Sequence, residues 1–281
     1  MPARSKVPDA PAAAKATAPR PRARKPKPPK AAIIAVANQK GGVAKTTSVA
    51  SLGAAFAELG KRVLLVDLDA QACLTFSLGV DPDAVEESIH HVLLGQADLD
   101  DVIVTCADGV DLVPSTIDLA GTEGALLGRP AREYVLQQVL AEVRDDYDVI
   151  LLDCSPSLGV LTLNALTAAT GVLIPMPCEM LSHRGVGQLL DTIADVKKFL
   201  NKRLIVLGVL PTLYDGRSSH ARAVLADVGE RYGLDVLEPP IPKTVRFAEA
   251  PGVGRSILAT ARTSKGAKAY RAVAQSLLPR L

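Results

Sequence analysis

Aromatic side chains are scarce in this sequence, and none of them is tryptophan. Phe, Trp and Tyr together make up 3% of its 281 residues. Proteins that hold single-stranded nucleic acid without sequence preference stack the bases on aromatic rings, so this mode of binding is not expected here. Contacts with a phosphate backbone remain open, because they depend on cations rather than rings.

Closely spaced cysteines are also missing. The four cysteines lie far apart and form no C-x-x-C pair, whereas zinc sites and disulfide frameworks show characteristic spacings. We therefore expect neither, and interpret the thiols as reduced and cytosolic. They are Cys73, Cys106, Cys154 and Cys178.

Long apolar runs are absent as well. No stretch approaches the roughly 18 residues that a helix needs to span a bilayer. Residues 1–30 lack the apolar core of a signal peptide. We therefore expect a cytoplasmic protein. Apolar residues still make up 48% of the chain, which is enough for a large buried core.

Charge is distributed unevenly. Residues 1–30 carry nine Lys or Arg against Asp9 alone, a net charge of +8, and the remaining 251 residues sum to −6. This segment is also rich in Pro and Ala, so it is predicted to be a disordered, partly polyproline tail. It either contacts nucleic acid or another polyanion, or it is a solvated arm. No linker follows residue 30, so residues 31–281 are predicted to form one domain.

From residue 31 onward, short apolar runs alternate with helical patterns. Continuous apolar strands separated by helices predict an α/β fold: a mostly parallel sheet with helices on both faces. The predicted strands are Ala32–Asn38, Arg62–Asp69, Val110–Ser115, Tyr147–Ser157, Gly171–Pro177 and Arg203–Thr212. The predicted helices are the amphipathic Lys45–Leu59 and the segments 131–145, 160–169, 183–200, 218–232 and 264–279.

The stretch "ANQKGGVAKTT" (Ala37–Thr47) joins the first strand to the first helix. It nearly matches the phosphate-binding pattern G-x-x-x-x-G-K-[ST], but Gln39 and Ala44 replace both framing glycines. A glycine-rich turn at a helix N-terminus directs backbone N–H groups and the helix dipole at an anion. Lys45 would meet the β- and γ-phosphates, and the Thr46 hydroxyl would coordinate Mg²⁺. Thr47 would donate to a further phosphate oxygen.

Acidic residues stand at the ends of two other predicted strands. Asp153 closes "VILLD", the usual position of a carboxylate that holds Mg²⁺ in nucleoside triphosphatases of this class. Asp67 and Asp69 end the strand after the first helix, and one of them would orient the attacking water while the other is structural. Ligands of parallel sheets bind beyond the carboxyl ends of the strands, so all of these residues are predicted to converge on one site.

These blocks resemble the ParA/MinD group of deviant-Walker ATPases, and specifically the ParA (Soj-like) partition ATPases. The resemblance covers about residues 32–280, and it rests on several matching blocks in the same order. They are "ANQKGGVAKTT", "LLVDLDAQ", "LVPSTIDLAGTE", "YDVILLDCSPSLG", "LYDGR" and "IPKTVRFAEAPGVGRSI".

The resemblance implies an ATP-dependent homodimer that sandwiches two ATP molecules, with Mg²⁺ as the second cofactor. Lys40 would reach into the partner protomer's nucleotide, so Gln39 is normal for the group. Asp69 matches the aspartate whose loss blocks hydrolysis. The loop residues that would contact ATP are Lys40, Gly41, Gly42, Val43, Ala44, Lys45, Thr46 and Thr47.

Further blocks have expected roles by the same resemblance. In "IPKTVR", Pro242 and Thr244 would lie against adenine, although Thr244 replaces the usual asparagine. Arg217 and Arg246 match positions used for non-specific DNA binding, with Lys243 as a weaker candidate. The implied protein is nucleoid-associated and segregates a chromosome or plasmid, and a ParB-like centromere-binding partner stimulates its hydrolysis and release.

Two rival functions remain open. A MinD-like ATPase would cycle on a membrane, but we expect no stable membrane association. The apolar stripe of the last helix (Tyr270, Val273, Leu277 and Leu278) is more simply explained by packing onto the domain. The other rival is a nucleotide-gated scaffold with negligible hydrolysis. Ala44 keeps this rival open. If the position needs a positive φ, an alanine there costs about 1–2 kcal/mol. If it does not, replacing glycine by alanine has almost no effect on the loop.

Overall fold

One seven-stranded sheet organises the structure, with the strand order β3-β4-β2-β5-β1-β6-β7. The computed structural model describes residues 31–179 and 182–281. The predicted basic tail, residues 1–30, lies outside the described residues. The strands are β1 Ala32–Val36, β2 Val63–Leu68, β3 Val104–Thr105, β4 Asp111–Val113, β5 Val149–Cys154, β6 Gly171–Pro177 and β7 Ile205–Thr212.

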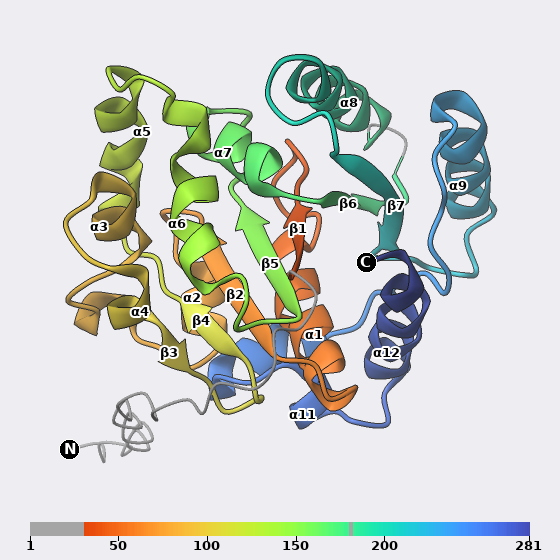
Figure 1. Ribbon diagram of the computed structural model, residues 1–281. Coiled ribbons are helices and arrows are strands. Elements are labelled where there is room, and N and C mark those ends of the chain that lie inside the picture. The colour runs from red at the N-terminus through yellow and green to blue at the C-terminus, as the bar shows by residue number, and fades with distance from the viewer. Residues whose placement is uncertain (1–30, 180–181) are drawn as a thin grey trace, which may run out of the picture.

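Helices cover both faces of this sheet (Figure 1). The α-helices are α1 Lys45–Glu58, α2 Cys73–Ser77, α3 Ile89–Leu94, α4 Leu99–Val102, α5 Leu119–Leu127, α6 Val135–Val143, α7 Val160–Ala168, α8 Ser182–Phe199, α9 Ser219–Tyr232, α10 Arg246–Glu249, α11 Ile257–Thr260 and α12 Lys265–Leu277. Short 3₁₀ turns lie at Pro82–Ala84, Arg132–Tyr134, Ala250–Val253 and Leu278–Arg280.

The predicted α/β fold is confirmed, and strand alternation explains how the two layers form. Ile33 and Ala35 of β1 face a core shared with α3–α9, whereas Ile34 and Val36 face a second core with α1, α2, α11 and α12. Successive side chains of a strand point to opposite faces. Apolar residues at every position of the central strands therefore give the sheet two buried faces. Only the pairing of β3 with β4 is antiparallel among the described strands.

Several details differ from the sequence predictions, which do not include strand β3 or the short helices α10 and α11. No helix is predicted between residues 70 and 130, where the structure has α2–α5. Three of these have at most six residues, and α5 (LAGTEGALL) is apolar or small on every side, so neither case produces a helical period. The first helix is predicted to be amphipathic, but α1 is buried continuously from Ser48 to Phe56 because α12 covers its outer side.

The apolar stripe of α12 packs onto the domain, as predicted. Tyr270, Val273 and Leu277 are fully buried, and the Tyr270 hydroxyl lies 3.0 Å from Ser48 Oγ on α1. Within the described residues, no helix combines the length and apolar character that a bilayer crossing demands.

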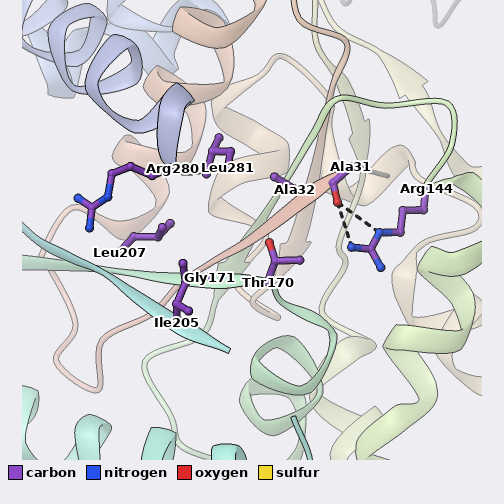
Figure 2. A pocket seen from close by; sticks show the side chains of 9 residues that line it. All are labelled: Ala31, Ala32, Arg144, Thr170, Gly171, Ile205, Leu207, Arg280 and Leu281. Atoms are coloured by element: carbon purple, nitrogen blue, oxygen red, sulfur yellow. Dashed lines mark hydrogen bonds between the residues drawn. The ribbon is translucent and has the colours of Figure 1, made fainter. Parts of the chain in front are cut away.

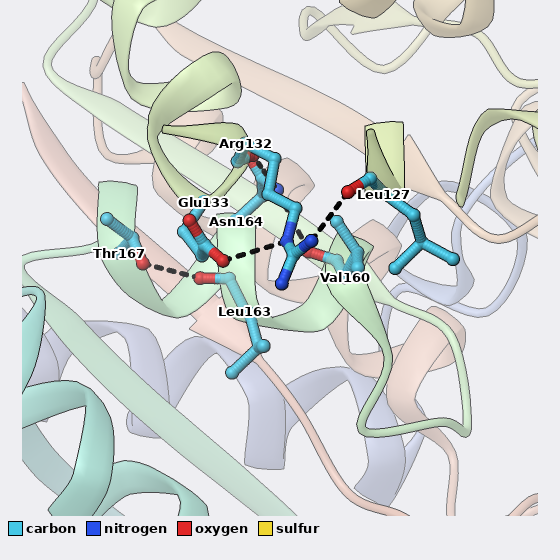
Figure 3. Close-up of polar contacts among 7 residues, drawn as sticks. All are labelled: Leu127, Arg132, Glu133, Val160, Leu163, Asn164 and Thr167. Carbon is cyan, nitrogen blue, oxygen red and sulfur yellow. Dashed lines mark hydrogen bonds and ion pairs between the residues drawn. The ribbon is translucent and has the colours of Figure 1, made fainter. Parts of the chain in front are cut away.

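Helix α7, which follows β5 and the loop 155–159, is attached to the turn before α6 by buried polar contacts (Figure 3). The Asn164 amide donates to Arg132 O at 2.8 Å and to Val160 O at 2.9 Å, and its oxygen accepts from Leu136 N–H at 3.0 Å. The Glu123 carboxylate accepts from Leu161 N–H at the start of α7. These bonds fix the helix that the loop after β5 enters.

Candidate functional site

Three adjacent strands bring the predicted site residues together. In the order β2-β5-β1, Asp153 near the end of β5 is in register with Val36 of β1 on one side and Asp67 of β2 on the other. The glycine loop leaves β1 and enters α1 at the same edge (Figure 1). The predicted convergence of the loop, Asp69 and Asp153 therefore follows from parallel pairing.

The loop is fixed at both ends by hydrogen bonds from neighbouring strands. Asn38 accepts from Lys40 N–H at 3.0 Å and donates to Pro175 O of β6 at 2.7 Å. The Thr212 hydroxyl at the end of β7 donates to Val43 O at 3.0 Å, and Val43 itself is buried. Between these anchors, Gly41 and Gly42 are exposed with open space where a Cβ would stand.

Ala44 has φ 67° and ψ 34°, the left-handed conformation, and it directly precedes α1. The question that the sequence leaves open is thereby answered: this position does require a positive φ. An alanine there is strained by about 1–2 kcal/mol, but the turn into the helix still forms.

Lys45 begins α1 and is buried, with its Nζ donating to Lys40 O at 3.2 Å. Burial lowers the pKa of Lys45, while the nearby charges of Asp153, Cys154 and Asp69 oppose this shift. Thr46 and Thr47 are half-buried in the first turn of the helix. The ammonium group therefore lies inside the loop, within electrostatic range of both candidate carboxylates.

The Asp153 carboxylate is buried, and within the part of the chain that the structure describes neither oxygen has a hydrogen-bond partner of normal geometry. Burial first, and then the charge of Asp67, raise the pKa of Asp153 well above its usual value, while the Thr46 hydroxyl and Lys45 lower it. A buried charge without a partner is costly. A cation beside Thr46 would remove that cost, so these residues fit Mg²⁺.

The donor set agrees with this ion. In the described part of the chain no three His, Cys, Asp or Glu side chains gather into a metal site. Mg²⁺ typically takes one or two protein ligands and completes its shell with phosphate oxygens and water. Thr46 and Asp153 beside a phosphate loop match that arrangement.

Asp67 and Asp69 have different environments. Asp67 is buried and accepts from Thr75 N–H at 2.9 Å, Thr75 Oγ1 at 2.7 Å and Asp69 N–H at 3.1 Å. Burial raises its pKa to about 6, although these hydrogen bonds oppose the shift. Asp69 lies beyond the end of β2 and is half-buried, and among the described residues its carboxylate accepts one hydrogen bond, from Gln71 N–H at 3.0 Å. Asp67 is thus tied to α2, and Asp69 is the more accessible carboxylate.

Lys40 forms an ion pair with Glu179, with 2.9 Å between Nζ and Oε2. Both side chains are largely exposed, at 42% and 63%. Glu179 follows the end of β6, the strand beside β1, and Gly185 of α8 packs against Asn38 and Lys40. Elements on the β6 side therefore direct the Lys40 side chain.

The remaining predicted residues gather beyond the end of β7. Pro242 bridges to Tyr214, and Lys243 N–H donates to Tyr214 O at 3.1 Å. The Thr244 hydroxyl accepts from Arg246 N–H at 3.4 Å, which places it at the start of α10. Since Thr212 holds the glycine loop, this segment is connected to the loop through β7.

The two arginines are exposed but locally paired. Arg217 donates to Asp215 at 3.1 and 3.3 Å, and Arg246 donates to Glu249 at 2.8 Å. The side chain of Arg217 is 93% exposed. Surface pairs of this kind are weak, so both guanidinium groups are available for exchange to another anion.

Sequence reasoning missed three residues that shape the site: Asn38, Thr212 and Glu179. Each stands at or just beyond the carboxyl end of a predicted strand. The rule that located Asp69 and Asp153 also applies to these positions. The identity of their partners depends on strand order, which one sequence does not provide.

Comparison with known proteins identifies the family. A family model described as an AAA domain matches residues 31–206. Soj of Bacillus subtilis, a sporulation initiation inhibitor protein, is 43% identical over 87% of this chain and 97% of its own length. The chromosome-partitioning ATPase Soj of Thermus thermophilus is 45% identical over 88% of this chain and 96% of its own.

Solved structures show the same fold. A Mycobacterium smegmatis protein described as cobyrinic acid a,c-diamide synthase, with bound ADP and magnesium, is 54% identical with a TM-score of 0.81. The alignment covers 89% of this chain and 95% of that one. The same protein has also been solved with an ATP analogue and magnesium.

The fold and the strand-end site define a P-loop nucleoside triphosphatase with a modified phosphate loop. With relatives at 40–45% identity over most of the chain, the protein belongs to the ParA (Soj-like) family of P-loop ATPases.

Proposed function

We propose that this protein is a partition ATPase whose ATP-bound dimer holds DNA and releases it after hydrolysis to ADP and phosphate. The observation that carries the proposal is the buried Asp153 carboxylate, which lies near Lys45 and Thr46 and has no hydrogen-bond partner of normal geometry among the described residues. In this proposal residues 31–281 act as one ATPase domain behind a basic tail. Its cofactors are ATP and Mg²⁺, which fit the ADP and magnesium of the M. smegmatis structure.

Each loop residue has a proposed role. Lys45 leaves Lys40 O to meet the β- and γ-phosphates, and Thr47 donates to a further phosphate oxygen. Thr46 and Asp153 hold Mg²⁺, which neutralises the charge on the phosphates. Gly41 and Gly42 leave room for the close approach of a phosphate. Pro242 and Thr244 flank the adenine, with Thr244 contributing mainly through its backbone because a single hydroxyl replaces the amide of the usual asparagine.

Asp69 is the proposed hydrolytic residue. It is the accessible member of the Asp67–Asp69 pair, and it would order a water molecule in line with the γ-phosphate. Lys40 would enter the nucleotide site of a second protomer, which couples dimer formation to ATP. Its ion pair with Glu179 then has to open first.

Arg217, Lys243 and Arg246 form the proposed DNA patch. They lie on two segments joined by the contacts between Tyr214, Pro242 and Lys243. Phosphate contacts from such exposed cations do not depend on base sequence. A ParB-like partner is proposed to stimulate hydrolysis and thereby to release the DNA.

Two observations weigh against other functions. The buried stripe of α12 is unavailable for insertion into a membrane, which disfavours the MinD-like alternative. Amide synthesis from glutamine requires an activated thiolate. Among the described cysteines, all four have a raised pKa because of burial, so none is an activated thiolate. The name given to the M. smegmatis protein is therefore not extended to this chain.

The proposal is tested by phosphate release in the presence of ATP, Mg²⁺ and duplex DNA. Asp69→Ala is expected to reduce the rate at least tenfold while ATP binding persists. Asp81→Ala is the matched control, because Asp81 also accepts a backbone N–H two residues on, at 3.1 Å, but lies outside the site. Equal rates for the wild type and Asp69→Ala would favour a nucleotide-gated scaffold.

The DNA patch is tested separately by retention on duplex DNA with ATP. Arg246→Glu is expected to weaken binding and to flatten the salt dependence by about 0.9 for each DNA phosphate that the variant no longer neutralises. Arg231→Glu, an exposed arginine at the end of α9, is the control. If Arg246→Glu leaves ATP-dependent retention intact at moderate salt, the patch is wrongly assigned.

A further inference from the structure

Thr75 is the centre of a buried hydrogen-bond network beside the proposed hydrolytic residue. It lies on α2, and its hydroxyl donates to Asp67 Oδ2 of β2 at 2.7 Å and accepts from Ser115 N–H, just beyond β4, at 2.9 Å. The Thr75 N–H donates to the same Asp67 oxygen at 2.9 Å. All three residues are fully buried. One side chain therefore ties α2 to the carboxyl ends of two strands.

The two oxygens of Asp67 hold the two ends of the turn that carries Asp69. Asp67 Oδ1 accepts from Asp69 N–H at 3.1 Å, where the turn begins, and Oδ2 accepts both bonds from Thr75, in the first turn of α2. Between them, Ala72 N–H donates to Asp69 O at 2.9 Å, and Ala72 has φ 51°. A positive φ persists for an alanine only where the surrounding structure fixes the backbone. Thr75 supplies the polar contacts that fix the far end of this turn.

Few other contacts among the described residues hold the Asp69 side chain. Its carboxylate accepts one hydrogen bond, from Gln71 N–H inside the same turn. Helix α2 has five residues, too few to be stable in isolation, and Ala72 at its N-cap gives it no side-chain hydrogen bond. Leu74 packs α2 into the core through apolar contacts, which are not directional. The Thr75 hydroxyl adds the directional contact that fixes the position of the turn.

We propose that Thr75 is a positioning residue for ATP hydrolysis, whose hydroxyl holds the Asp69 turn where the carboxylate can order the attacking water. This inference rests on the proposed role of Asp69 in hydrolysis. A catalytic group has to be held within about 0.5 Å of its productive position, so a small shift of the turn should reduce the rate. The hydrogen bonds of this network do not involve Lys45 or Thr46, so ATP binding should be retained.

Thr170 provides a matched comparison at the opposite end of the sheet. Its hydroxyl also both donates and accepts, since it donates to Ile33 O at 2.9 Å and accepts from Ile33 N–H at 3.0 Å. It directly precedes β6 and lines a pocket at the amino ends of the strands, together with Ala32 at the start of β1 (Figure 2). Valine at either threonine removes a comparable pair of hydrogen bonds, but only Thr75 is connected to the Asp69 turn.

The test measures kcat and KM for ATP of the full-length protein from phosphate release with Mg²⁺ and duplex DNA, each rate corrected for the folded fraction from urea unfolding. Thr75→Val is expected to lower kcat by about tenfold or more and to leave KM within about twofold of the wild type. Thr75→Ser keeps the hydroxyl and should stay within about threefold of the wild-type kcat. Thr170→Val should keep the wild-type kcat. Should Thr75→Val fail to fold, Thr75→Cys replaces it, because a thiol is a weaker donor and acceptor, and it too should lower kcat alone.

The Asp69→Ala background shows whether the hydroxyl acts through Asp69. There, Thr75→Val should change the residual rate by less than about twofold, because the carboxylate that it positions is missing. Equal losses of kcat in Thr75→Val and Thr75→Ser, or a further large loss in the Asp69→Ala background, would overturn the inference. If Asp69→Ala lowers the rate and Thr75→Val does not, the inference fails while the proposed function stands. If Asp69→Ala keeps the full rate, both fail.

Discussion

At the scale of single residues, Ala44 is the clearest departure from a standard phosphate loop. Its φ of 67° is a conformation that glycine adopts freely and alanine does not. The loop keeps this conformation because its neighbours determine it: Val43 is buried and held by Thr212, and Lys45 starts α1. The strain is therefore absorbed by the fold, and the loop can still present its N–H groups.

Ala44→Gly is predicted to stabilise the protein. Relief of about 1–2 kcal/mol of strain outweighs the roughly 0.4–1 kcal/mol by which glycine favours the unfolded chain. The free energy of unfolding in urea should therefore rise by about 0.5–1 kcal/mol. ATP affinity should change less than tenfold, which is under about 1.4 kcal/mol.

Ala131→Gly is the control for that substitution, since Ala131 has φ 53° on an exposed turn. It should give a similar gain in stability with no effect on ATP. A gain in ATP affinity above tenfold for Ala44→Gly alone would show that the native loop is impaired.

At the scale of elements, the contact between α1 and α12 supports the phosphate loop, because the loop leads directly into α1 and α12 packs against that helix. Glu58 at the end of α1 accepts two hydrogen bonds from Arg271 of α12, at 2.5 and 2.8 Å. The hydrogen bond from Arg271 lowers the pKa of Glu58, and burial opposes this shift. A carboxyl group with a lowered pKa in the folded state stabilises the fold above its unfolded pKa of 4.5, and this contribution is lost as the pH falls through the folded value.

Glu58→Gln should therefore lower the free energy of unfolding by about 0.5–1 kcal/mol at pH 7. The two proteins should converge in acid, below the lowered pKa of Glu58, where the wild-type side chain is neutral as well. Thermal unfolding as a function of pH measures both effects. Glu142→Gln, an exposed glutamate without an ion pair among the described residues, should show neither. A difference that persisted in acid would contradict an electrostatic origin.

The elements also show what a single sequence can predict. Gly171–Pro177 is predicted at its observed bounds because an unbroken apolar run has few alternatives in a covered sheet. Helix α5 has no such signal, since its exposed side carries small residues together with the apolar Leu127, and its buried side carries Leu119, Thr122 and Leu126. Its existence depends on the core that it covers.

The candidate site divides in the same way. That Lys45, Asp69 and Asp153 converge is predictable, because parallel strands end at one edge. The conformation of Ala44 is not predictable. Alanine strongly prefers a negative φ, but it can adopt a positive φ at a cost of about 1–2 kcal/mol, so the residue type alone does not fix the sign. The pairing of Lys40 with Glu179 spans 139 residues and depends on β6 lying beside β1. The local sequence pattern reveals neither the positive φ of Ala44 nor the pairing of Lys40 with Glu179.

At the scale of the whole molecule, the cations fall into groups at different ends of the sheet. Lys40 and Lys45 lie at the nucleotide edge, Arg217 and Arg246 lie beyond the end of β7, and the exposed cations Lys197, Lys198, Lys202 and Arg203 lie before its start. Only the first group is expected to respond directly to ATP. Nucleotide-dependent behaviour of the whole protein therefore depends on what Lys40 contacts.

Glu179→Gln tests how Lys40 is restrained. Lys40 has to leave Glu179 before it can reach a second protomer's nucleotide, and an exposed pair of this kind contributes at most about 1 kcal/mol. Removing the carboxylate charge should raise the ATP-dependent dimerisation constant by up to about fivefold. Without nucleotide, the Glu179→Gln variant should sediment as the wild type does. Analytical ultracentrifugation with ATP and Mg²⁺ measures the change, using Asp69→Ala as the background to prevent hydrolysis.

Two comparisons make the outcome specific to this ion pair. Glu142→Gln removes the same charge from the protein as a whole and should leave dimerisation unchanged. Lys40→Ala should abolish the ATP-dependent dimer with or without Glu179→Gln, because the released side chain is then missing. If Glu179→Gln instead weakened the dimer, Glu179 would contribute to the contact between protomers, and its pairing with Lys40 would support assembly rather than restrain it.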